Sequence, residues 1–225
     1  MAKKITLEDY EQLESRIRGW PWPERVAIAA AAAQRLLIHY QGLPLKYRNR
    51  LAAGLGVHLT RLWTTLLSGS GAVDPILKKA FAKLDAKLND YDPDQDQDID
   101  DDIDDDNAIP AVHYALREYC LRDGRYPSAA PHRLLGEAAR LVRNMAGMSE
   151  QDLMSDKVQA REDLFTRREF DRILSMANII ELQGITPKSI ESLRRLCDSG
   201  ALGTPWRGSR RPKPAIDDRK IKNHK

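Results

Sequence analysis

The sequence predicts an all-α protein, a single compact bundle of seven to nine helices. Apolar residues recur at the three- and four-residue spacing of one helix face, and no stretch alternates with period two for long enough to be a strand. Caps, prolines and glycines stand where helices begin and end. The chain has 225 residues, 42% hydrophobic and 31% charged, which suits a globular core and excludes a collagen or a largely disordered chain.

Prolines separate the first two helices. Thr6 and Asp9 form a capping pattern that predicts the first helix. The sequence Trp-Pro-Trp-Pro at 20–23 ends it, because proline lacks an N–H group and disfavours the α conformation of the residue before it. A second helix is expected up to about Tyr40. Its alanine-rich stretch, 27–33, has high helix propensity and little bulk, which predicts a central position.

The third and fourth helices precede an aspartate-rich segment. Leucines spaced four, four, three and four apart from Leu51 mark the third helix, and the Ser-Gly-Ser-Gly sequence at 68–71 ends it. Asp74 followed by Pro75 predicts the start of the fourth. We expect one core to contain Leu59, Leu62, Trp63, Leu66, Phe81 and Leu116.

Four helices are expected after that segment. Pro110 is expected to open the fifth, and the sixth follows Ser128. A long helix is expected from about Asp156 to Gln183, and Thr186 with Pro187 begins the last one.

Charge is concentrated in two segments, although the net charge is only +3. Residues 89–106 hold eleven aspartates and no lysine or arginine, whereas residues 205–225 hold eight basic residues and two aspartates. We therefore expect a helical domain, 1–204, with an aspartate-rich insertion at 89–106, and a basic C-terminal tail at 205–225.

The aspartate run is the first candidate site. Counted from Asp92, it has Gln97 where a calcium-binding EF-hand loop needs glycine, and Ile103 where it needs glutamate. A weak cation site and a plain solvated insertion stay open, and a third interpretation is binding to a basic protein surface. The candidate partner-binding residues are Asp92, Asp94, Asp96, Asp98, Asp100, Asp101 and Asp102.

The tail is the second candidate site. Its basic side chains could neutralise phosphates, but Trp206 is its only aromatic residue, so base stacking would be weak. A solubilising extension is an equal alternative. The candidate nucleic-acid-binding residues are Arg207, Arg210, Arg211, Lys213, Arg219, Lys220 and Lys222.

No other motif predicts chemistry, so we expect no catalytic residue, metal or cofactor. The histidines have no metal-site spacing, and His113 with Cys120 makes only an incomplete zinc site, which favours packing. Cys120 and Cys197 are expected to be buried reduced thiols in a cytoplasmic protein. Basic residues interleaved with acidic ones on the last two long helices predict a solvated face; they are Arg167, Arg168, Arg172, Arg194 and Arg195, with Glu162, Asp163, Glu169 and Asp171.

Four helical patterns resemble those of a known family. They are Trp22 with Arg35, Leu36 and Tyr40; Leu59, Leu62, Trp63 and Leu66; Pro110, Ala111, Val112, Ala115 and Leu116; and Ile190, Leu193, Arg194, Leu196 and Gly200. Over about residues 15–203 the chain resembles the YjaG-like bacterial proteins, family 416 of domains of unknown function. The resemblance implies a compact helical fold, no established activity and no catalytic residues. The aspartate run looks longer than the family's acidic stretch, and the tail has no counterpart.

Three function classes stay open. The first is a non-enzymatic protein-interaction protein, for example an inhibitor or immunity-type protein that meets a basic surface, which the aspartate run suits. The alternative is a nucleic-acid-associated protein that binds phosphates through the tail. The third is an enzyme whose site assembles only in three dimensions. No apolar run is long enough to span a membrane.

Overall fold

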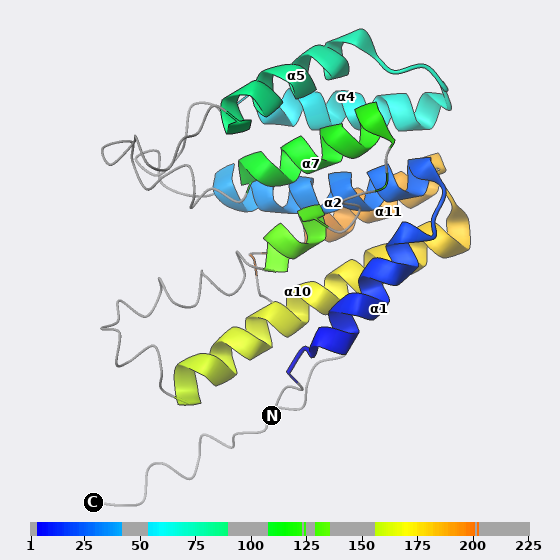
Figure 1. The fold of residues 1–225 in the computed structure, drawn as a ribbon. Coiled ribbons are helices and arrows are strands. Elements are labelled where there is room, and N and C mark those ends of the chain that lie inside the picture. Colours follow the sequence, from blue (N-terminus) through cyan, green and yellow to red (C-terminus); the bar gives the residue numbers. More distant parts are fainter. Residues whose placement is uncertain are drawn as a thin grey trace, which may run out of the picture.

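All regular structure in the described residues is helical. The computed structural model describes residues 4–41, 54–89, 108–122, 124, 129–135, 156–200 and 202. These residues form eight helices, which confirms the predicted class. Seven are labelled in Figure 1, and the eighth spans 129–135. The labelled helices are α1 (Leu7–Arg18), α2 (Trp22–Gln41), α4 (Leu55–Ser68), α5 (Pro75–Asn89), α7 (Ala108–Leu121), α10 (Asp156–Gln183) and α11 (Pro187–Cys197).

Helix α2 lies at the centre of the bundle, as its alanine content predicts. Helices α4 and α5 lie on one side of it and α10 and α1 on the other (Figure 1). Every alanine from Ala27 to Ala33 is at most 1% exposed. Because alanine side chains are short, a neighbouring helix comes close to this backbone: the Cys197 thiol donates to the carbonyl oxygen of Ala31 at 3.2 Å. Helices α4, α7, α10 and α11 all pack against α2.

Short-range capping bonds define several helix starts. The Thr6 hydroxyl accepts a bond from the Asp9 amide, and the Asp9 carboxylate accepts one from the Thr6 amide. The Asp74 carboxylate accepts bonds from the amides of Ile76 and Leu77 at the start of α5. These bonds satisfy amides that have no partner within the helix, which confirms the predicted starts. At the other end of α4, Gly69 has a φ of +62°, a conformation that favours glycine.

One predicted boundary needs correction. Helix α7 begins at Ala108, so Pro110 lies within its first turn instead of opening it. Proline is tolerated there because the first amides of a helix have no intrahelical acceptor. The described part of α4 begins at Leu55, and Gly54 precedes it. Leu51, the expected start of its apolar stripe, lies outside the described residues.

The predicted core is confirmed. Trp63 is 2% exposed, and its indole nitrogen donates to the Gln34 side chain of α2 at 2.6 Å. Leu59, Leu62, Leu66 and Leu116 are buried with it. Phe81 is partly buried and packs against the same cluster.

Helix α1 runs alongside α10 (Figure 1). The rings of Tyr10 and Phe170 meet edge to face with their centroids 5.9 Å apart. Further along, the Arg16 guanidinium donates to Asn178 at 2.6 Å and to both carboxylate oxygens of Glu181 at 2.6 Å. These contacts fix α1 on the outer face of α10. Among the described helices, none combines the length and the apolar character needed to cross a membrane.

Candidate functional site

The two flanking helices of the aspartate-rich segment are the first part of the candidate site. All seven predicted aspartates, Asp92 to Asp102, lie outside the described residues. Helix α5 precedes the segment and α7 follows it, and the two run antiparallel. At one end the Asp74 amide donates to the Tyr119 hydroxyl at 2.9 Å, and further along Asp85 meets His113 at 2.8 Å. Asn89 and Ala108 therefore lie at the same end of the bundle.

His113 joins these two helices close to that end. Its ring stacks on Phe81 with centroids 5.4 Å apart, and its Nε2 contacts the Asp85 carboxylate. Burial lowers the pKa of His113; Asp85 opposes this effect, and the charge of Arg117 adds to it. The imidazole is therefore mostly neutral at pH 7, and it serves packing between α5 and α7.

The described residues contain no group of three or more histidine, cysteine or acidic side chains that could hold a metal ion. Both cysteines are free thiols. Cys197 is fully buried, as predicted, and burial raises its pKa to about 12. Cys120 is only half-buried, and burial raises its pKa to about 11. Neither is a thiolate nucleophile at neutral pH.

The seven basic residues predicted in the tail, Arg207 to Lys222, also lie outside the described residues, as does the expected domain boundary at 204. The turn that leads towards the tail is described, and it is firmly held. The Arg35 guanidinium donates to the carbonyl oxygens of Cys197, at 3.0 Å, and Gly200. Leu202 is 1% exposed.

A buried charge cluster surrounds this turn. The Arg35 guanidinium of α2 forms two bonds to the Glu169 carboxylate of α10, from Nη2 at 3.1 Å and from Nε at 3.4 Å. The Arg172 guanidinium donates to the same carboxylate and, at 3.2 Å, to the carbonyl oxygen of Ser199. The three side chains are 0–1% exposed. The two cations thus meet the carbonyl groups at the C-terminal end of α11, where the helix dipole is negative.

The charges of this cluster depend on one another. Burial of the Glu169 carboxyl works to raise its pKa, but Arg35 and Arg172 outweigh burial, and the pKa lies below its usual value. Burial lowers the pKa of Arg172, which Glu169 opposes. A guanidinium stays protonated at neutral pH in any case, so the cluster carries two positive charges and one negative charge.

Here the predicted solvated face is wrong for two of its residues. Glu169 and Arg172 are fully buried, whereas Arg194 and Arg195 are exposed as expected. A signal for this was present in the sequence: Glu169 and Arg172 stand four residues before Ile173 and Met176, which line the buried stripe of α10. Because no substrate can reach these side chains, the cluster anchors the structure and is not an active site.

A second buried ion pair lies between α2 and α7. The Arg25 guanidinium donates to the Glu118 carboxylate at 2.7 Å, and Glu118 is 2% exposed. The Trp22 indole donates to the carbonyl oxygen of Glu118 at 3.0 Å, and the Arg122 guanidinium lies over the Trp22 ring. This ion pair holds the end of α7 against the beginning of α2.

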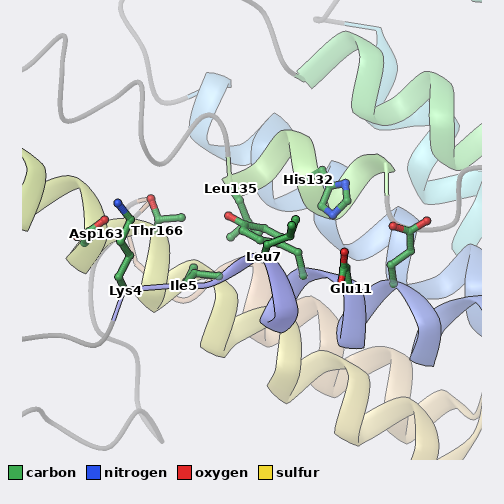
Figure 2. Close-up of a pocket in the computed structure, with 10 residues that line it drawn as sticks. Lys4, Ile5, Leu7, Glu11, His132, Leu135, Asp163 and Thr166 are labelled. Atoms are coloured by element: carbon green, nitrogen blue, oxygen red, sulfur yellow. The ribbon is translucent and has the colours of Figure 1, made fainter.

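A pocket of about 610 Å³ lies between α1, helix 129–135 and α10 (Figure 2). Its described lining is mixed. It contains the apolar or aromatic residues Ile5, Leu7, Tyr10 and Leu135 and the polar residues Lys4, Glu11, Glu14, His132, Asp163 and Thr166. The sequence did not predict this pocket, because its parts come from three segments far apart in the chain.

No protein-family model and no curated protein matches the chain. Among solved structures, the crystal structure of a DUF416 family protein from Shewanella baltica OS155 is similar. It is 19% identical in sequence and superposes with a TM-score of 0.55, over 82% of this chain and 92% of that one. DUF416 is family 416 of domains of unknown function, so the predicted resemblance is confirmed at the level of the fold. The chain has the same helical fold as this protein.

Proposed function

We propose that the protein is a non-enzymatic interaction protein whose aspartate-rich segment, residues 89–106, binds a basic surface of a protein partner. Within this class, an inhibitor or immunity-type protein that covers a partner's basic site fits the charge best. We place it in the cytoplasm, where its two free thiols would stay reduced.

The observation that carries the proposal is the antiparallel packing of α5 against α7. It brings Asn89, where the segment begins, and Ala108, just after its end, to one end of the bundle. The helices are held together by buried contacts, among them the stack of Phe81 on His113. A segment that contains eleven aspartates is thereby attached at both ends to a rigid base.

Charge supports a partner outside this chain. Burial of uncompensated carboxylates costs several kcal/mol each, so such a segment faces water, cations or a basic partner. Carboxylates in this density attract a basic surface over a distance of about 8–10 Å at physiological salt and accelerate encounter. The described core also offers a reason against catalysis: its buried charged residues are engaged with one another and closed to a substrate.

The experiment is affinity capture from an extract of cells that produce the protein, with and without nuclease. One bait is the wild type, and a second carries Asp→Ser at Asp96, Asp98, Asp100, Asp101 and Asp102. A matched control carries Asp→Glu at the same five positions, which preserves the charge. We expect a basic protein that binds wild type and the Glu variant and is lost from the Ser variant, with or without nuclease.

Two results would contradict the proposal. If the Ser variant captures the same proteins in the same amounts, the segment has no role in binding. If all capture disappears after nuclease treatment, and also after substitution of Arg207, Arg210 and Arg211 by Ser, the protein associates with nucleic acid through its tail.

A further inference from the structure

We propose that the pocket between α1, helix 129–135 and α10 binds a small organic ammonium ion with an apolar body. This site is separate from the aspartate-rich segment, and neither proposal depends on the other. Its volume of about 610 Å³ lies within the range of small-molecule sites, about 300–1,000 Å³.

The pocket has an apolar floor, formed by aliphatic side chains. Figure 2 shows Ile5, Leu7 and Leu135 gathered at its centre. Leu7 is 74% exposed, although it belongs to a helix whose Leu13 and Ile17 are buried. When an apolar group of a ligand covers an exposed leucine, the complex is stabilised by about 25 cal/mol for each Å² of apolar surface removed from water. The floor therefore favours a ligand with an apolar body.

Aromatic contacts hold one wall of the pocket in place. The Tyr10 ring meets the His132 ring edge to face with centroids 5.6 Å apart, and on its other side it meets Phe170. Phe170 is 2% exposed, so it anchors Tyr10 to the core. The wall is therefore formed before a ligand arrives, which lowers the entropic cost of binding.

The charges of the rim decide the sign of the ligand. Among the described residues that line the pocket, three carboxylates, Glu11, Glu14 and Asp163, outnumber one ammonium group, Lys4. One oxygen of Glu14 also pairs with Arg18 at 2.5 Å, outside the pocket. Partial burial lowers the pKa of His132, and the charge of Glu14 opposes this effect, so the ring is mostly neutral at pH 7. The charges of the described lining residues thus attract a cation and repel an anion.

Three probes of similar shape separate charge from apolar contact: 2-phenylethylamine, the neutral 2-phenylethanol and the anionic 3-phenylpropionate. Binding is measured by NMR from the shifts of the His132 ring and of the Ile5, Leu7 and Leu135 methyl groups. We expect saturable binding of the amine, at least about threefold tighter than that of the alcohol, and no binding of the carboxylate. An ammonium bound near His132 should also lower the pKa of that ring, since two cations disfavour each other.

Rim variants test the residues. Glu11→Gln together with Asp163→Asn should weaken amine binding by about threefold to tenfold, as expected for the loss of two partly exposed charge interactions. Glu8→Gln, an exposed change on α1 outside the pocket, is the matched control and should leave binding unchanged. A far-ultraviolet spectrum checks that each variant stays helical.

The proposal is overturned if the amine gives no saturable shift of these signals up to about 10 mM, which corresponds to a very weak affinity. It is also overturned if alcohol and amine bind equally, or if the rim variant binds the amine as the wild type does. Tighter binding of a lysine-containing tripeptide than of the amine would assign the pocket to a peptide and contradict the choice of a small molecule.

Discussion

Arg35 and Glu169 are separated by 134 residues in the chain, yet their side chains meet at 3.1 Å with no more than 1% of either exposed. Arg172 shares the same carboxylate, and together the two arginines hold the carbonyl groups that end α11. Desolvation of three charges is costly, and the cost is offset only while every partner is in place. The C-terminal end of the described fold therefore depends on one carboxylate.

Substitution of this carboxylate should destabilise the fold strongly. Glu169→Gln leaves two buried guanidinium groups without their anion, and we expect a loss of about 3–5 kcal/mol in the free energy of unfolding, measured in urea. The control is Glu191→Gln, which removes the exposed partner of Arg195 and should cost at most about 0.5 kcal/mol. Similar unfolding midpoints for the two variants would mean that the buried cluster is not formed.

The same residue predicts how stability depends on pH. The folded pKa of Glu169 lies below its usual value of 4.5, because two guanidinium groups favour the carboxylate. The stabilisation that the Glu169 charge gives to the folded state is thus complete above about pH 4.5. It is lost as the pH falls through the folded pKa. The difference in unfolding free energy between wild type and Glu169→Gln should shrink from pH 6 to pH 3.5. A difference that stays constant over this range would mean that folding does not lower the pKa of Glu169.

Trp63 tests the assignment of the core. Trp63→Ala removes a side chain that is 2% exposed and leaves a cavity, so we expect a loss of about 3–5 kcal/mol. Trp63→Phe loses the bond to Gln34 but keeps most of the volume, and it should cost less than half as much. Urea unfolding followed by circular dichroism measures both. An unchanged midpoint for the alanine variant would place Trp63 on the surface.

The contact between Asp85 and His113 predicts a change in titration. Asp85 raises the pKa of His113 against the effects of burial and of Arg117. Asp85→Asn removes the charge, so the pKa of His113 should fall further, as seen by NMR of its ring protons. His132, whose pKa responds to Glu14, is the internal control and should not move. A rise in the pKa of His113 would contradict the contact between α5 and α7.

The sequence predicted those parts of the fold that depend on residues close together in the chain. Thr6 and Asp74 mark helix starts because each side chain accepts a bond from an amide, of Asp9 and of Ile76, that is only two or three residues further along the chain. The four-residue spacing from Glu169 to Ile173 was a sign of its burial, but its partner Arg35, 134 residues away, could not be identified from the local charge pattern. An acidic residue between arginines looks the same on a solvated face and in a core.

The candidate sites likewise have one feature that the sequence predicts and others that only the folded structure shows. The charge of the aspartate run is visible in the composition, whereas the antiparallel packing that joins its two flanking residues at one end follows only from the structure. The pocket could not be predicted, since Leu7, His132 and Asp163 come together only when α1 folds onto α10.

The rate of association tests the central claim most directly. With the basic protein identified by capture, on-rates are measured at about 0.05 and 0.3 M salt for wild type and for the variant with five Asp→Ser changes at positions 96, 98, 100, 101 and 102. We expect the variant to bind more slowly at low salt and the difference to shrink at high salt, because exposed charges are screened within about 6 Å at 0.3 M. Equal on-rates for both proteins at both salt concentrations would contradict binding through the aspartate-rich segment.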